Sequence, residues 1–168
     1  MSTIQYVTKE TLEQMKAELQ RMRAVDRPAA SRAIAEAREK GDLKENAEYD
    51  AAKEKQRHIE GRIRQMEHKI SHANVIDVAS LSGPKIVFGA TVTLRDENTD
   101  DVLCYQIVGV DEADLEQCKI AIDSALAREL IGKEEGATIE FVTPRGEKHY
   151  FVEKVVYDPH FDGRIANK

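Results

Sequence analysis

The sequence GDLKENAEY, residues 41–49, separates two stretches whose apolar residues recur at alternating intervals of three and four. The first stretch contains Leu12, Met15, Leu19 and Met22, and the second contains Ile59, Ile63, Met66, Ile70 and Ala73. Such spacing is typical of the apolar seam of a coiled coil. The antiparallel pairing joins Leu12 with Ala73, Met15 with Ile70, Leu19 with Met66 and Met22 with Ile63. Every pair is symmetric about one point between Asp42 and Leu43. The pattern therefore predicts an antiparallel α-helical coiled-coil hairpin over residues 9–75 that turns back at this point.

Local residues near the turn support this prediction. Gly41 suits the position that follows a helix C terminus. Asp42 precedes Glu45 by three residues, which resembles a capping box opening the second helix. Thr8 suits the N-cap of the first helix, and Pro28 is expected to kink that helix or to mark its weakest turn.

The same symmetry pairs Ala33 with Ala52 near the turn. Two small side chains let the helices approach closely, but they bury little apolar area. A long hairpin with so little buried surface at its end makes a poor core. It is well suited to carrying a few residues far from a globular body.

After the turn-forming sequence ASLSGPK, residues 79–85, the apolar period changes from about 3.5 residues to about 2. Strands are predicted over residues 86–94, 102–110, 118–122, 137–143 and 148–157, with the last two joined at Pro144-Arg145-Gly146. A short helix is predicted over 124–132, ended by Gly132. These elements predict a small α+β domain with an antiparallel sheet.

The predicted organisation has four parts. We expect a hairpin in residues 1–77 with an acidic tip near 41–46, a linker in 78–85, a sheet domain in 86–157 and a mobile tail in 158–168.

Charge is distributed unevenly along the 168-residue chain, whose formal net charge is −6. Residues 1–75 hold 15 Lys and Arg against 13 Asp and Glu, whereas residues 76–168 hold 10 against 18. A nearly neutral first half and an acidic second half indicate two units with different surfaces. The acidic total argues against a protein whose main task is to coat nucleic acid.

The compartment is predicted from the cysteines and from the apolar runs. Cys104 and Cys118 form no C-x-x-C motif and have no His at metal-binding spacing, so we expect reduced thiols. The N terminus lacks the apolar region of a secretory signal, and no apolar run approaches the roughly 18 residues of a membrane helix. We therefore expect a cytoplasmic protein with no membrane partner.

The clearest candidates for chemistry are Asp42 and Glu45. They fit a helix cap, but a rigid turn could equally present both carboxylates to a site elsewhere. Two carboxylates alone hold Mg²⁺ weakly, because this ion requires six oxygen ligands and keeps several waters. They could complete the coordination of an ion that another protein already holds in part. Helical spacing predicts solvated side chains for His58, His68 and His72.

Residues 33–56, AIAEAREKGDLKENAEYDAAKEKQ, closely resemble the coiled-coil tip of bacterial Gre-type transcript cleavage factors, and the GreA branch in particular. The resemblance continues through EGRIRQMEHKISHANVID (60–77), FGATVTL (88–94), IVGVDEAD (107–114) and DSALARELIGKEEG (123–136). It extends from the first helix to about residue 157. It implies that the sheet domain has an FKBP-like fold.

The resemblance also implies a function and a partner. A Gre-type factor binds RNA polymerase and inserts its coiled coil into the secondary channel, where the RNA 3′ end of a backtracked complex is extruded. The residues matching Asp42 and Glu45 would then help the polymerase to hold a second Mg²⁺ ion. The factor needs no cofactor of its own and is not itself an enzyme. It would act as a monomer and would dock through a surface that includes Ile122, Asp123, Ser124 and Ala125.

Two other functions stay open. The first is a regulator that occupies the same channel without stimulating cleavage, although intact Asp42 and Glu45 argue against it. The second is a coiled-coil scaffold with a prolyl isomerase domain. The absence of Trp gives it little support, because isomerase pockets of this fold are lined with aromatic residues.

Overall fold

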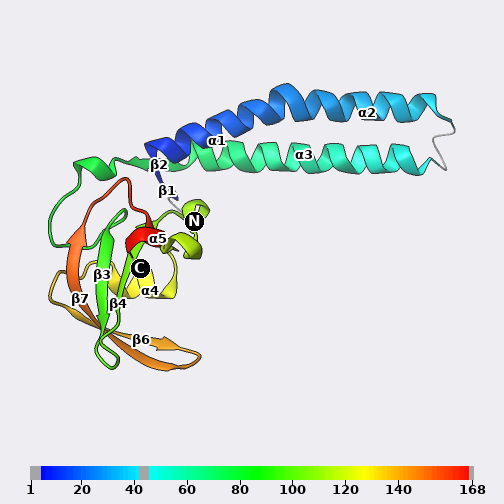
Figure 1. The fold of residues 1–168 in the computed structure, drawn as a ribbon. Helices are drawn as coiled ribbons and strands as arrows, with labels where there is room; N and C mark the ends of the chain where they lie inside the picture. The colour runs from blue at the N-terminus through cyan, green and yellow to red at the C-terminus, as the bar shows by residue number, and fades with distance from the viewer. Residues whose placement is uncertain (1–4, 42–45, 167–168) are drawn as a thin grey trace. The chain divides into compact units, whose positions relative to one another are not determined.

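The computed structural model describes residues 5–41 and 46–166 and divides into two compact units. One unit is formed mainly by residues 10–73, and the other by residues 6–9 together with the chain from residue 74 onward. The first is a helical hairpin and the second contains a β-sheet with short helices (Figure 1). The predicted fold class of a helical hairpin followed by an α+β sheet domain is therefore confirmed.

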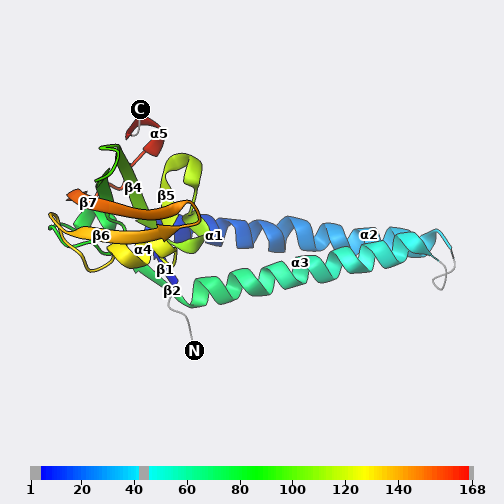
Figure 2. The ribbon, with the colours of Figure 1, turned by 90° about the horizontal axis from the view of Figure 1, so that it is seen from below.

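The hairpin has a broken first arm and a continuous second arm. The first arm consists of α1 (Lys9–Arg21), a π-helical segment (Met22–Asp26) and α2 (Arg27–Glu39), and the second is α3 (Ala47–Ser71). The two arms run side by side in opposite directions (Figures 1 and 2). Helix α3 starts later than the predicted capping box at Asp42 and Glu45 would place it. It also ends earlier than the predicted residue 75, because residue 73 already belongs to a strand.

The predicted seams pack against each other in the part of the hairpin near α1. Leu19, Met22 and Ile63 form a buried cluster, and the half-buried Ile59, Met66 and Ile70 pack against it. Met22 and Ile63 are only 2% and 1% exposed. This cluster agrees with the register predicted from the symmetry of the two seams.

Beyond Met22 the seam shifts by one residue. The buried side chains of α2 are Ala30 and Ala37, and Ala30 follows Met22 by eight residues instead of the seven of a heptad. The π-helical segment absorbs the additional residue, and the Arg27 N–H donates to the Met22 carbonyl five residues earlier. A kink or weak turn was predicted at Pro28, and the irregular turn of the structure lies shortly before this proline, in the π-helical segment.

The shift changes which alanines are buried near the end of the hairpin. Ala52 of α3 is buried, as a seam residue should be. Ala33, its predicted partner, is only half-buried. The expected pairing at this end was wrong in detail, because it assumed an uninterrupted heptad from Met22 onward.

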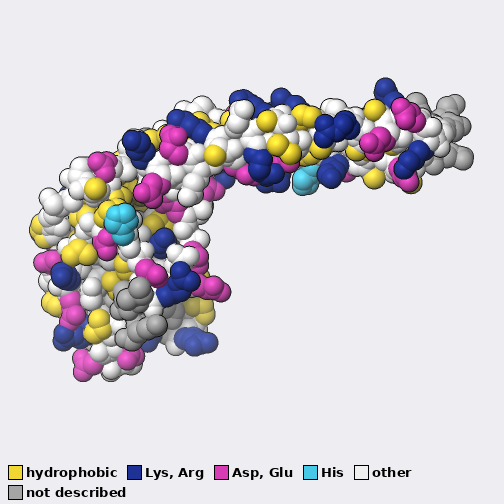
Figure 3. Space-filling view, turned by 45° about the horizontal axis from the view of Figure 1, so that its top comes forward, with side chains coloured by type: hydrophobic (Ala, Val, Ile, Leu, Met, Phe, Trp, Pro, Cys, Tyr) yellow, Lys and Arg dark blue, Asp and Glu magenta, His cyan; other side chains and the backbone are white. Residues whose placement is uncertain are grey.

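Ion pairs link the two arms on the surface. The guanidinium of Arg27 makes two hydrogen bonds with the Glu60 carboxylate, at 2.7 and 2.9 Å, and these lower the pKa of Glu60. Arg23 pairs with Glu67. Solvent screens such exposed pairs, so they help to fix the register more than they add stability. Both acidic and basic side chains are visible on the surface of the hairpin in Figure 3.

The second unit contains a five-stranded sheet with the order β5-β4-β3-β7-β6. The strands are β3 (Thr91–Asp96), β4 (Val102–Val108), β5 (Lys119–Ala121), β6 (Thr138–Thr143) and β7 (Gly146–Val156). Neighbouring strands are antiparallel except β4 and β5, which are parallel. The prediction of a wholly antiparallel sheet is therefore corrected. Two 3-10 turns, Val110–Glu112 and Leu115–Gln117, return the chain so that β5 can run parallel to β4.

Helix α4 (Ala125–Leu130) covers one face of this sheet and completes its core. Ala127 and Leu130 of α4 are fully buried among strand residues. The core cluster consists of Ile86, Ala90, Val92, Leu94, Ile107, Ile120, Ala127, Leu130, Ile139, Tyr150, Val152 and Val155.

A two-stranded sheet of β1 (Gln5–Thr8) and β2 (Ala73–Ile76) was not predicted. The Tyr6 ring lies 5.7 Å from the Phe88 ring, and the Thr8 hydroxyl donates to the Glu112 carboxylate at 2.9 Å. A 3-10 turn, Val78–Ser80, follows within the predicted linker.

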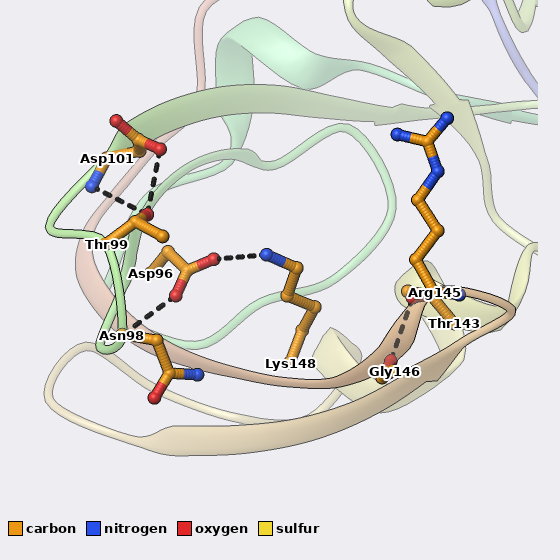
Figure 4. A network of polar contacts seen from close by, with 8 residues as sticks. All are labelled: Asp96, Asn98, Thr99, Asp101, Thr143, Arg145, Gly146 and Lys148. Carbon is orange, nitrogen blue, oxygen red and sulfur yellow. Dashed lines mark hydrogen bonds and ion pairs between the residues drawn. The ribbon is translucent and has the colours of Figure 1, made fainter.

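A buried carboxylate holds the turn between β3 and β4. Asp96 is 3% exposed and accepts hydrogen bonds from the Lys148 ammonium at 3.0 Å and from the Asn98 backbone N–H at 2.9 Å (Figure 4). The bond from Lys148 is the main cause that lowers the pKa of Asp96. Asp96 thereby joins the β3–β4 turn to β7.

Residues 158–166, expected to be a mobile tail, instead pack against the second unit. Phe161 is only 9% exposed, and a short helix, α5 (Gly163–Ala166), follows it. No helix in the described part of the chain is long and apolar enough to cross a membrane.

Candidate functional site

The predicted tip residues Asp42 and Glu45 lie outside the described residues. The structure describes both of their flanks. Helix α2 ends at Glu39, and Gly41 follows with a φ of 149°, in the positive range that favours glycine. This agrees with the predicted role of Gly41 after the helix end.

Asn46 connects the ends of the two arms. Its side-chain oxygen caps α3 by accepting hydrogen bonds from the N–H groups of Glu48 at 3.1 Å and Tyr49 at 3.2 Å. Its side-chain NH₂ donates to the Ala37 carbonyl of α2 at 2.8 Å. One amide therefore holds the last turn of one helix against the first turn of the other.

The cap at Asn46 was missed in the sequence, although the signal was present. Asparagine is among the most favoured N-cap residues, and Asn46 stands directly before the helix-forming run that starts at Ala47. The capping box expected at Asp42 and Glu45 falls in the part of the chain that the structure does not describe.

Tyr49 and several basic residues surround the end of the hairpin. The Arg38 guanidinium and the Lys53 ammonium lie 5.8 and 5.4 Å from the centre of the Tyr49 ring. The hydrogen bond with Arg38 is the main cause that lowers the pKa of the Tyr49 hydroxyl. Lys40 pairs with Glu48 at 3.2 Å. The described flanks of the tip thus combine a rigid backbone with exposed positive charge.

Metal binding by this chain alone has no support among the described residues. No group of three or more His, Cys, Asp or Glu side chains in residues 5–41 and 46–166 could hold a metal ion. His58, His68 and His72 are exposed, as predicted. Cys104 and Cys118 are half-buried and form no disulfide, and burial raises the pKa of Cys104.

The segment 122–125, predicted to bind a partner, forms a tight connection between β5 and α4. The Ile122 N–H donates to the Val108 carbonyl at 2.8 Å, and the Ser124 N–H donates to the Ala121 carbonyl at 2.9 Å. The Ser124 hydroxyl caps α4 by accepting from the Ala127 N–H at 3.2 Å. Asp123 and Ala125 remain exposed on this rigid connection, which we call the docking segment.

Family profiles match both units of the chain. The profile described as "Transcription elongation factor, N-terminal" matches residues 5–75, and that described as "Transcription elongation factor, GreA/GreB, C-term" matches residues 81–157. These matches cover most of the chain. The protein belongs to the GreA/GreB family of transcription elongation factors.

Individual relatives agree with this assignment. The transcription elongation factor GreA of Thioalkalivibrio sulfidiphilus is 56% identical over 144 residues, which cover 85% of this chain and 91% of that protein. The GreA of an Anaeromyxobacter species (strain K) is 53% identical over 151 residues, which cover 90% and 91% of the two chains.

Solved structures also match along most of their length. The GreA factor homolog 1 (Gfh1) of Thermus thermophilus is 27% identical, and the match covers 91% of this chain and 99% of that one. Its TM-score is 0.42, which is too low for a detailed structural comparison.

Proposed function

We propose that this protein is a transcript cleavage factor that acts on RNA polymerase. In this proposal the helical hairpin enters the secondary channel of a backtracked elongation complex and brings Asp42 and Glu45 to the active centre. The polymerase then cleaves its own RNA endonucleolytically and resumes synthesis from a new 3′ end. The protein is not itself an enzyme, because the catalytic centre belongs to the polymerase.

The observation that carries the proposal is the construction of the hairpin end. Asn46 bonds to both arms there, and the sequence places Asp42 and Glu45 between Gly41 and Asn46. Helix α3 has 25 residues, which corresponds to roughly 37 Å at the usual helical rise. Such an arm is long and narrow, and it buries mainly alanines near its end. A long, narrow arm is poorly suited to forming a core. It is well suited to carrying the tip into a deep channel.

The donor set at the tip fits a magnesium ion that is shared with the polymerase. Carboxylate oxygens are the ligands that Mg²⁺ prefers, but two carboxylates leave much of its six-coordinate shell to waters or other ligands. Asp42 and Glu45 would therefore add ligands to an ion held in part by the polymerase. A magnesium ion in a two-metal hydrolytic site activates the attacking water and stabilises the leaving oxygen.

The described side chains would orient the tip and guide it. Asn46 fixes the direction in which the chain leaves α2 and enters α3. Arg38 and Lys53 are exposed basic residues on the described flanks of the tip, and their charge would favour its approach to RNA phosphates. The docking segment 122–125 would bind the polymerase outside the channel. We expect the protein to do this as a cytoplasmic monomer.

The alternative of a channel-binding regulator without cleavage activity predicts a different outcome in one assay. A stalled, backtracked elongation complex with end-labelled RNA is incubated with Mg²⁺ and the protein. The wild type should shorten the RNA. The variant Asp42→Ala/Glu45→Ala should bind equally well but leave the RNA uncut, with a loss of about 100-fold or more in cleavage rate, since the catalytic Mg²⁺ ion would lose two carboxylate ligands.

Two further variants test separately whether cleavage depends on the charge of the tip carboxylates, on their side-chain size or on their position. Asp42→Asn/Glu45→Gln preserves side-chain size but removes the charge, so it should be as inactive as the alanine variant. Glu36→Ala/Asp50→Ala removes the same charge from exposed positions on α2 and α3 and should cleave like the wild type. Full activity of the tip variants would refute the proposed mechanism. Binding by the wild type without cleavage would establish the regulator instead.

A further inference from the structure

The last part of the chain, residues 158–166, lies beyond the family match that ends at residue 157. We call these residues the C-terminal strap. They pack on the second unit next to β4 and to the turn that precedes β5 (Figure 1). Their position raises the question of what the strap holds in place.

One hydrogen bond to β4 and one buried ring fasten the strap, and two further hydrogen bonds lie within it. The side-chain NH₂ of Gln106, a buried residue of β4, donates to the Asp158 carbonyl at 2.8 Å. The Phe161 ring is nine-tenths buried. Asp158 and Asp162 each accept a backbone hydrogen bond two residues on, from His160 at 2.9 Å and from Arg164 at 3.0 Å, which shapes the strap locally.

Gly163 makes the closest contact with the rest of the unit. A methyl group added there would lie 2.6 Å from Cβ of Cys118 and closer still to the Gln117 carbonyl oxygen. Real Cβ atoms do not approach other atoms so closely, and the Gln117 carbonyl group opposite is part of the backbone. Only glycine at this position lets the strap lie directly on residues 117 and 118.

The residue beneath the strap has an unusual backbone. Cys118 has a φ of 54°, in the left-handed region that non-glycine residues rarely adopt. A conformation of this kind persists when surrounding contacts hold it. Here the Cys118 carbonyl accepts from the Gln106 N–H at 3.0 Å, the Cys118 N–H donates to the Leu115 carbonyl at 3.1 Å, and Gly163 lies against Cβ of Cys118.

Only three residues of β5 separate Cys118 from the docking segment. Strand β5 pairs with β4 through Lys119, Ile120 and Ala121. Ile122 and Ser124 then bond to the carbonyls of Val108 and Ala121. Residues 117–118 are therefore connected to Asp123 and Ala125 through one short strand and its hydrogen bonds.

We propose that the C-terminal strap is a positioning element for the docking segment, with Gly163 and Phe161 as its positioning residues. The strap presses on Gln117 and Cys118, keeps Cys118 in its left-handed conformation and so fixes the direction in which β5 leads into residues 122–125. This inference rests on the proposed function for its consequence, which is the affinity of the protein for RNA polymerase.

The first test uses Cys118 as a reporter in the free protein and does not depend on the polymerase. In a Cys104→Ser background, the rate at which a maleimide reacts with Cys118 is measured by mass spectrometry. Gly163→Ala and Phe161→Ala should each raise this rate by about tenfold, because a loosened strap opens more often. Arg164→Ala, an exchange of an exposed side chain in the same short helix, should leave the rate unchanged.

The second test measures docking through transcript cleavage at a series of protein concentrations. Gly163→Ala should raise the half-saturating concentration by about fivefold while the maximal cleavage rate stays at the wild-type value, because the tip is unaltered. A loss of folding would instead remove the near-ultraviolet circular dichroism of the tyrosines, which is recorded for every variant. Arg164→Ala again serves as the matched control.

The outcomes separate the two proposals. Wild-type protein that does not stimulate cleavage refutes the proposed function, and the thiol test then still decides whether the strap holds residues 117–118. If the wild type is active but Gly163→Ala and Phe161→Ala change neither the thiol rate nor the half-saturating concentration, the positioning role is refuted. A fall in the maximal rate alone would also contradict it.

Discussion

At the scale of single residues, Asn46 joins the described ends of the two arms. Its oxygen caps α3, and its nitrogen donates to the last turn of α2. A side chain with only an acceptor could satisfy the first role but not the second. The two roles can therefore be separated by substitution.

Asn46→Ala should lower the free energy of unfolding of the hairpin by about 1–2 kcal/mol, because both the cap and the bond to Ala37 are lost. Asn46→Asp keeps the cap and should restore most of this stability. Hydrogen exchange of the Glu48 and Tyr49 amides measures the cap directly. Equal protection of these amides in all three proteins would show that Asn46 does not hold the end of the hairpin.

Asp96 gives a prediction about pH. Its folded-state pKa lies below the unfolded value of about 3.9, because Lys148 donates to it. The interaction therefore stabilises the protein above the unfolded pKa and is lost as pH falls through the folded pKa. The stability difference between wild type and Asp96→Asn should be constant near neutrality and shrink below about pH 4.

Urea unfolding followed by the tyrosine circular dichroism signal checks this, because four of the five tyrosines lie outside the hairpin in residues 6, 105, 150 and 157. A stability difference that persists undiminished at pH 3 would mean that the charge of Asp96 is not responsible. Lys148→Met provides a second variant that removes the same pair from the other side.

At the scale of elements, the π-helical segment Met22–Asp26 reconciles the sequence with the seam. The first arm contains one residue more than a regular heptad allows between Met22 and Ala30, and the wider turn absorbs it. Val25 lies in this turn and is 55% exposed. The additional residue is therefore accommodated on the solvent side.

Deletion of Val25 should convert the segment into regular α-helix and leave Ala30 and Ala37 on the seam, with a change in stability within about 1 kcal/mol. Ala17 is an exposed residue of α1, in a part of the helix that follows the regular heptad spacing. Its deletion should displace buried seam residues and therefore lower the free energy of unfolding of the hairpin by more than about 2 kcal/mol. Far-ultraviolet circular dichroism during thermal unfolding measures both. Similar destabilisation by the two deletions would contradict the account of the π turn.

The elements show where sequence reasoning succeeded and failed. The 3-4 spacing predicted the two arms and the packing of Met22 with Ile63, because the core of a two-helix structure is its seam. The interruption could not be located, since Pro28 indicates an irregular turn but not its form. The parallel orientation of β5 was not predicted. The sequence of a three-residue strand does not indicate the turns that reverse the chain before it.

Contacts between distant parts of the chain were also beyond the sequence pattern. The strand β1 pairs with β2 some seventy residues later, and the C-terminal strap packs on β4. Short polar segments of this kind look like loops or tails when read alone, because tertiary contacts decide their structure. The predicted tip residues came from the resemblance and from their place at the turn, and they remain a prediction.

At the scale of the whole molecule, the two units have different tasks in the proposed function. The first carries 15 basic and 13 acidic residues up to position 75, and the rest of the chain carries 10 and 18. In that function, a nearly neutral hairpin with intermixed charges would approach RNA without strong nonspecific binding. We expect the acidic second unit to be repelled by nucleic acid and to bind the polymerase protein instead.

The proposed function requires that Asp42 and Glu45 supply ligands to a magnesium ion that the polymerase holds weakly. The most direct test is the rate of RNA cleavage by a backtracked complex as a function of Mg²⁺ concentration, with and without saturating protein. The wild type should lower the half-saturating Mg²⁺ concentration by about tenfold, since added carboxylates raise metal occupancy. Asp42→Asn/Glu45→Gln should leave it at the value of the polymerase alone. If wild type and variant give the same Mg²⁺ dependence, the tip carboxylates do not act on the metal, and the claim is wrong.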